Sequence, residues 1–237
     1  MSDGTTMSAN DFILTQDSAA HGGCPPASCS PSSFACIVAD PPWRIDLNRK
    51  TPHKRSGQKN GREWAHKDVA QLAYPTMSDD EIAALRPPVA DAAHLYIWTV
   101  NAKVEAAYRI ARQWGFRPAS LLTWVKTPMG IGLGGTFCNT TEFCLFARRG
   151  TLPAKKRVES TWWHWKRGKH SKKPEAFQDM VEAVSPGPYL EMFARRKRHG
   201  WHSWGNEITP DVEIHSPQNA ESCHTRREPT TDCNGDD

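Results

Sequence analysis

A carboxylate, two prolines and an indole follow directly after a short apolar run, as Asp40, Pro41, Pro42 and Trp43. The run itself, residues 34–39, has the length and β-branched content of a buried strand. Proline lacks the backbone N–H that a sheet ladder needs, so this strand must end at Asp40. Ligands of open α/β sheets bind at the carboxyl ends of the strands. We therefore predict that this tetrapeptide forms part of a ligand site.

The rest of the chain alternates predicted strands with predicted helices. Further strand-like segments, the last of them a short strand or turn, are residues 94–99, 118–126, 143–147, 189–193 and 200–205. Helices are predicted to begin near Ser78, Asn101 and Pro174. This alternation predicts an α/β fold with a mostly parallel central sheet and helices on both faces.

Basic residues concentrate in two segments of a chain whose formal net charge is only +4. Residues 44–67 hold eight Lys and Arg against two acids, and residues 148–173 hold ten against one. Two such blocks favour a polyanion partner, although either alone is also typical of a solvated loop. Trp162, Trp163 and Trp165 are interleaved with the second block, which suits nucleic-acid stacking or a tryptophan cluster in the core. The pattern leaves both interpretations open.

The chain of 237 residues suits one domain with flexible ends. We predict a flexible leader at 1–33, a folded domain at 34–208 and a disordered acidic tail at 209–237. The cysteines include no C-x-x-C pair and their spacings fit no common zinc pattern, so no metal site is predicted. The polar start and the lack of a long apolar run predict a soluble, cytoplasmic protein.

Four blocks of the sequence stand in the order in which they occur in the MT-A70 family of N6-adenine methyltransferases, which the chain resembles over about residues 34–208. They are Asp40-Pro41-Pro42-Trp43, Asn139-Thr140-Thr141-Glu142, His170-Ser171-Lys172-Lys173-Pro174, and 190–195 together with 200–207. The resemblance implies a Rossmann-like methyltransferase fold with a permuted order, in which the catalytic block comes first and a cofactor-binding block last. Phe193-Ala194-Arg195 stands where related amino-methyltransferases often carry a Phe-x-Gly-x-Gly turn, and Arg-bearing turns occur in this family.

The resemblance also implies S-adenosylmethionine as the methyl donor and assigns roles residue by residue. Catalysis falls to Asp40, Pro41, Pro42 and Trp43. Cofactor binding falls to Val38, Ala39, Asp40, Lys173, Glu191, Phe193, Arg195, Asn206 and Glu207, with Lys173 near the cofactor carboxylate. Substrate binding falls to Trp43, Arg44, Lys126, Asn139, Glu142 and His170.

The expected chemistry explains why these residue types are needed. The N6 amine of adenine is a poor nucleophile because its lone pair is delocalised into the ring. Asp40 accepts one N–H bond and the Pro41 carbonyl accepts the other, which favours a pyramidal nitrogen with a free lone pair. The prolines restrict the backbone and preorganise both acceptors. Trp43 offers a face for stacking the base, which a duplex would first have to flip out.

Several alternatives stay open at this point. The compact chain lacks a separate target-recognition domain and resembles stand-alone bacterial and phage members, which favours DNA over RNA. An RNA N6-adenosine methyltransferase is the first alternative. A non-catalytic nucleic-acid-binding subunit is the second, although the intact motif with Lys173 and Asn206 argues against degeneration. A cytosine amine or a small-molecule acceptor is weaker, because the basic segments would then lack a purpose. A homodimer and a heterodimer are both compatible with the sequence.

Overall fold

The computed structural model describes residues 33–45, 75–127, 137, 139–166, 168 and 172–215. The predictions for the leader, most of the basic segment 44–67, His170 and the end of the tail lie outside these residues. Among the helices of the described part, none is long and apolar enough to cross a membrane.

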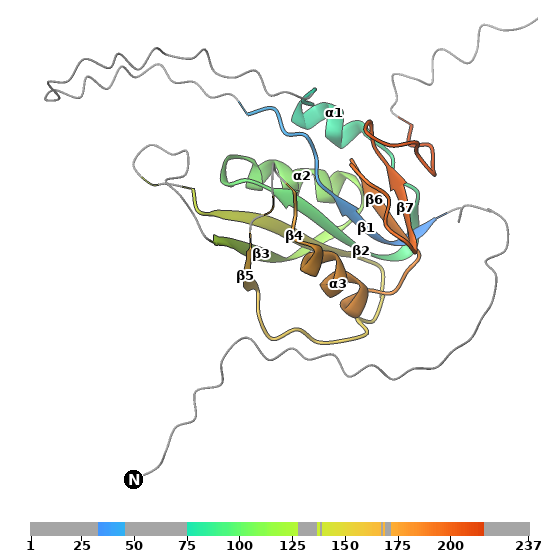
Figure 1. The fold of residues 1–237 in the computed structure, drawn as a ribbon. Coiled ribbons are helices and arrows are strands. Elements are labelled where there is room, and N and C mark those ends of the chain that lie inside the picture. Colours follow the sequence, from blue (N-terminus) through green and yellow to red (C-terminus); the bar gives the residue numbers. More distant parts are fainter. Residues whose placement is uncertain are drawn as a thin grey trace, which may run out of the picture.

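One seven-stranded sheet forms the centre of the fold, in the order β5-β3-β4-β2-β1-β6-β7 (Figure 1). The strands are β1 Phe34–Ala39, β2 Val89–Thr99, β3 Arg117–Thr127, β4 Thr141–Arg149, β5 Trp162–Lys166, β6 Tyr189–Met192 and β7 Trp201–Trp204. All neighbours pair in parallel except β4, which is antiparallel to both β2 and β3. The predicted mostly parallel, Rossmann-like α/β architecture is confirmed.

The helices cover both faces of this sheet. They are α1 Asp79–Ala84, α2 Val104–Gln113 and α3 Glu175–Val184, with a 3-10 turn, η1 Asn101–Lys103, before α2. The predicted start of α1 is confirmed, because Ser78 and Glu81 form a capping box. The sequence also predicts that Asn101 caps the second helix, and this is wrong: the 3-10 turn intervenes, and α2 begins after Lys103 without a side-chain capping bond.

Alternation along the strands builds two cores, one on each face of the sheet. On the first face, Ile37, Leu95 and Leu145 pack with residues of α1 and α2. On the second, Val38, Tyr96 and Cys144 pack with Phe177 and Val181 of α3. Because successive side chains of a strand point to opposite faces, a continuous apolar run such as β1 is buried on both sides.

Because most strands run in the same direction, their carboxyl ends lie at the same edge of the sheet. β1, β2, β3, β5, β6 and β7 all run the same way, so their carboxyl ends meet there, along with the first residues of β4. β1 and β6 are direct neighbours although they lie far apart in the sequence: Cys36 is in register with Tyr189, and Ile37 with Leu190. The motif at the end of β1 therefore lies beside the segment that follows β6.

Candidate active site

The turn after β1 is fixed by backbone hydrogen bonds. The Trp43 amide donates to the Pro41 carbonyl at 2.8 Å, and the Met77 amide donates to the Pro42 carbonyl at 2.8 Å. The Arg44 amide in turn donates to the Met77 carbonyl at 3.0 Å. The segment before α1 thus holds the proline turn from outside, and the direction of the Pro41 carbonyl is set before any ligand arrives.

Trp43 is a packing residue of this turn. Its side chain is only 6% exposed and lies in the core on the α1 and α2 face. Its indole Nε1 donates to the Trp98 carbonyl at the end of β2, at 3.0 Å. The sequence predicted an open aromatic face for stacking a base, but the described residues leave little of this ring uncovered. In this structure Trp43 anchors the proline turn to β2.

Four alternating charges run along the carboxyl edge from β3 to β1. Lys126 near the end of β3 pairs with Glu142 on β4. The other Glu142 oxygen lies 3.4 Å from the Lys173 Nζ, which donates to both Asp40 oxygens at 2.8 Å. The four side chains come from separate parts of the sequence, and each was predicted for the site.

Lys173 is held as a cation by this arrangement. Burial disfavours its ammonium, but Asp40 and Glu142 together outweigh that effect and raise the pKa of Lys173 above its ordinary value. Burial likewise opposes the Glu142 carboxylate, yet Lys173 and Lys126 lower the pKa of Glu142 overall. Lys173 Nζ also lies 5.2 Å from the centre of the Trp98 ring, a cation–π contact. Trp98 was not predicted for the site.

Glu191 brings a third carboxylate to the edge, on the strand next to the motif. It is in register with Val38 and accepts a hydrogen bond from the Gln178 amide of α3 at 2.7 Å. Val38 and Ala39 themselves are buried and paired on both sides with β2 and β6. A ligand therefore meets β1 only at its end, from Asp40 onward.

The titration of Glu191 predicts a measurable pH dependence of stability. Burial raises its pKa to about 7 from the usual 4.5, against Arg196 and Gln178, which lower it. The folded protein then binds this proton more tightly than the unfolded chain. The stability that Glu191 contributes is therefore complete below about pH 4.5 and is lost as the pH rises through about 7.

Glu191→Gln should remove this one titration. We expect the free energy of unfolding of the native protein to fall, relative to the variant, by roughly 3 kcal/mol across that pH range. Urea unfolding of both proteins at a series of pH values measures the difference. A difference that stays constant with pH would contradict the assignment.

The turn after β6 lies against the end of β7. Phe193 has a φ of +63°, uncommon for a residue with a side chain, and its ring packs edge-on against Trp204 at 5.4 Å. The Ala194 amide donates to the Trp204 carbonyl at 2.9 Å. Gly205 lies so close that a Cβ there would stand 2.2 Å from the Ala194 carbonyl oxygen. Only glycine permits this approach.

Gly205→Ala should therefore destabilise the protein by about 1–3 kcal/mol, because the added methyl overlaps backbone. Gly200→Ala is the matched comparison, because an added methyl at Gly200 would meet no other atom. The cost there comes only from placing alanine at a φ of +78°, and is about 1–2 kcal/mol. Thermal unfolding compares the two, and cofactor affinity should fall in Gly205→Ala only. A Gly205→Ala protein as stable as the native one would contradict the close approach.

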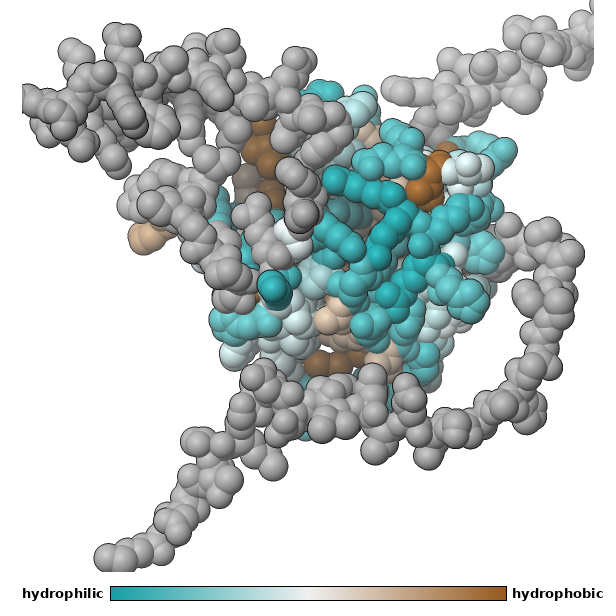
Figure 2. All heavy atoms as spheres, in the orientation of Figure 1, coloured by the Kyte–Doolittle hydropathy of each residue, from teal (hydrophilic) through white to brown (hydrophobic). Residues whose placement is uncertain are grey.

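Acids of α3 hold the basic run that follows this turn. Arg196 pairs with Glu175 and donates to Gln178 at 3.0 Å, and Arg198 donates to Glu182 at 2.8 Å and to Asp179. Hydrophilic residues accordingly gather over α3 and the neighbouring end of β6 and β7 (Figure 2). The arginines of this run fix the turn onto α3, a role that the sequence did not reveal.

The remaining predicted residues lie at the surface around this edge. Arg195 and Glu207 form an exposed ion pair at 3.6 Å, and Asn206 beside them is also exposed. Arg44 is exposed, with Glu81 at 3.8 Å. Asn139 is exposed three residues before Glu142. Within the described ranges no group of three or more His, Cys, Asp or Glu side chains is arranged to hold a metal.

Comparison with known proteins identifies the family. The MT-A70 family model matches residues 34–207, which is most of the chain. The chain belongs to the MT-A70 family. The resemblance predicted from four sequence blocks is thereby confirmed.

The relatives that this chain matches differ in length. The type II methyltransferase M.MunI of a Mycoplasma species is 31% identical over 198 residues, covering 79% of this chain and 83% of its own. The human N(6)-adenosine-methyltransferase catalytic subunit is 26% identical over 195 residues, covering 74% of this chain. A Medicago truncatula relative named as a putative N(6)-adenosine-methyltransferase is 27% identical, covering 74% of this chain. The chain spans only 28% and 26% of these two longer relatives.

Proposed function

We propose that this MT-A70 protein transfers a methyl group from S-adenosylmethionine to the N6 amine of adenine in DNA. The observation that carries the proposal is the ion pair between Asp40 and Lys173, beside a proline turn whose carbonyl direction is fixed. This pair places two groups at one edge of the sheet: Asp40 as an acceptor for the adenine amine, and Lys173 as a cation for the cofactor carboxylate. Relatives named as N(6)-adenosine methyltransferases support the choice of amine.

The residues at this edge fit the proposed cofactor. Lys173 provides a charge-assisted donor for an amino-acid carboxylate. Glu191 near the end of β6 suits ribose hydroxyls, and Arg195, Asn206 and Glu207 are exposed polar groups in the segments that follow β6 and β7. When bound, S-adenosylmethionine supplies an electrophilic methyl group.

The chain's own residues orient and activate the amine. Asp40 accepts one N6–H bond, because a carboxylate has about four lone-pair positions and Lys173 takes only some of them. The Pro41 carbonyl already accepts the Trp43 amide and keeps a second lone pair for the other N6–H bond. Preorganised acceptors favour the pyramidal nitrogen that attacks. Asp40 is placed to take the proton that the product amine releases, with water as the alternative acceptor.

DNA is favoured over RNA by the relative that the chain matches along most of its length. That relative is the type II methyltransferase, whereas the N(6)-adenosine methyltransferases contain long regions that this chain does not span. The test is incubation with labelled S-adenosylmethionine and matched DNA and RNA oligonucleotides. We expect labelling of DNA to exceed labelling of RNA, and a clear preference for RNA would overturn the choice of polymer.

A non-catalytic partner subunit is the second candidate function, and cofactor binding separates it from an enzyme. The retained Asp40 and Lys173 favour the enzyme, because a subunit that only scaffolds has no need of either group. Equilibrium binding of labelled S-adenosylmethionine should be saturable for an enzyme. A protein that binds the cofactor yet labels neither polymer would indicate that a partner subunit is missing and that the active form is a heterodimer.

A further inference from the structure

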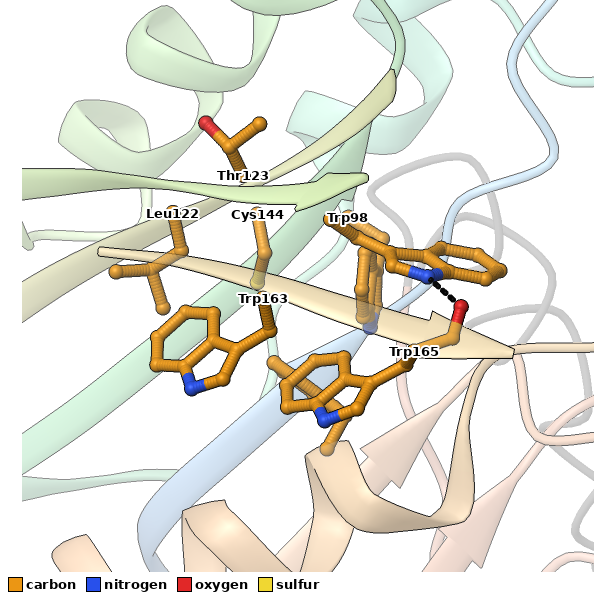
Figure 3. Close-up of a pocket in the computed structure, with 8 residues that line it drawn as sticks. Trp98, Leu122, Thr123, Cys144, Trp163 and Trp165 are labelled. Carbon is orange, nitrogen blue, oxygen red and sulfur yellow. Dashed lines mark hydrogen bonds between the residues drawn. The ribbon is translucent and has the colours of Figure 1, made fainter. Parts of the chain in front are cut away.

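Strand β5 sorts the tryptophan-rich segment into two faces. Trp163 and Trp165 point toward α3, with rings stacked at 5.1 Å and an interplanar angle of 9° (Figure 3). Trp165 also contacts Phe177 edge-on at 6.3 Å, and its carbonyl accepts the Trp124 indole N–H at 2.9 Å. Both are half-buried: Trp165 packs against the core on the α3 face, and Trp163 stacks on Trp165. Of the two interpretations that the sequence left open, packing on the core therefore holds for Trp165.

The opposite face of β5 presents an exposed strip, formed by Trp162, His164 and Lys166. Trp162 is 54% exposed, and its ring meets the His164 ring edge-on at 5.3 Å. In register, these residues lie beside Thr123, Val125 and Thr127 of β3, and Thr123 points away from α3 (Figure 3). Among the described tryptophans only Trp162 is exposed to this extent, and no packing role within those residues accounts for it.

The composition and spacing of this β5 strip suit one kind of partner. An indole, an imidazole and an ammonium group at alternate positions stand about 7 Å apart along the strand. Aromatic rings stack on bases, and adjacent cations contact phosphates, which together is how proteins bind single strands. A purely apolar protein partner is disfavoured, because two of the three side chains are polar. Duplex DNA hides its base faces, so stacking on Trp162 requires unpaired bases.

The place of the strip relative to Asp40 defines which nucleotides it meets. β5 runs parallel to β3 and ends at the same edge, where Lys126 is in register with Trp165. Four strand spacings separate β5 from β1, or about 19 Å across the sheet. That distance is too long for the target adenine itself and suits nucleotides a few positions away on the same strand.

We propose that the β5 strip binds unpaired nucleotides flanking the target adenine, with Trp162 stacking on a base and Lys166 contacting the backbone. The inference rests on the proposed function and deepens it, because it makes the substrate single-stranded or locally opened. Trp162 and Lys166 are binding residues here and take no part in methyl transfer.

The test uses fluorescence anisotropy of the full chain with a labelled oligothymidylate, without cofactor. Trp162→Ala should weaken binding roughly 5- to 100-fold, and Trp162→Phe should restore most of it because the ring face returns. Lys166→Gln should reduce the salt dependence of binding by about one phosphate contact. Lys197→Gln, on the far side of the sheet near β7, is the charge-matched control and should change little.

Pairing the oligothymidylate with its complement should remove the effect of Trp162→Ala, because the base faces are then hidden. Equal loss on single strand and duplex would overturn the proposal, as would a Trp162→Ala variant that binds normally. Light scattering of the same variants addresses a second copy of this chain: a dimer lost in Trp162→Ala with oligonucleotide binding intact would also overturn it. Because this binding assay needs no cofactor, failure of methyl transfer alone would refute the proposed function, whereas single-strand binding by the β5 strip would still be measured independently.

Discussion

Asp40→Ala is expected to abolish methyl transfer, with a fall in rate of at least about 100- to 1,000-fold, while S-adenosylmethionine still binds. The physical reason is the loss of the carboxylate that accepts an N6–H bond beside the fixed Pro41 carbonyl. Lys173 keeps Glu142 at 3.4 Å, so the cation that suits the cofactor carboxylate stays in place. Single-turnover transfer and equilibrium binding, measured on the same preparation, separate the two effects.

Asp91→Ala is the control for this experiment. Asp91 is an exposed carboxylate near the amino-terminal end of β2, at the edge of the sheet opposite the site. Its removal should leave transfer and binding unchanged. Near-full activity of Asp40→Ala would show that the amine is activated by other groups and that the mechanism proposed for Asp40 is wrong.

Lys173→Met should lower the affinity for S-adenosylmethionine by on the order of 10- to 150-fold, because a hydrogen bond to a charged group contributes about 1.5–3 kcal/mol. The change also leaves Asp40 and Glu142 without the cation between them. Without that cation the pKa of Glu142 rises toward its ordinary value. Calorimetric titration with S-adenosylmethionine measures the loss.

The neighbouring lysine gives a matched control. Lys172 is exposed and pairs with Glu175 on α3, away from Asp40. Lys172→Met removes the same charge one residue earlier and should change cofactor affinity less than about twofold. If both variants bound S-adenosylmethionine equally well, Lys173 would not be the group that holds its carboxylate.

Much of the fold and site follows from local sequence signals. Prolines after β1 fix where that strand ends, and alternating elements then place the ends of β1 and β6 at one edge. Asp40 and Lys173 are 133 residues apart in sequence, yet both were predicted for the site and are in direct contact. Short motifs in a set order carry this information because they lie at the ends of strands and helices: Asp40 directly follows β1, and Lys173 lies just before α3.

Other features depend on tertiary packing that no short window contains. The sequence predicts that Trp43 offers an open face for stacking, but the ring is buried by contacts with β2 and with the segment before α1. β5 was not predicted as a strand, because its mixture of Trp, His and Lys is no clear strand signal in the sequence alone. The segment forms a strand by pairing with β3. Gln178 and Arg196 reach Glu191 and Glu175 across separate elements, and their side-chain directions could not be read from spacing.

The most direct test of the central claim is nucleoside analysis by mass spectrometry after reaction with S-adenosylmethionine and a single-stranded DNA that contains all four bases. We predict N6-methyldeoxyadenosine as the product with the native protein and none with Asp40→Ala. A methylated cytosine, or N6-methyldeoxyadenosine formed equally by both proteins, would contradict the account.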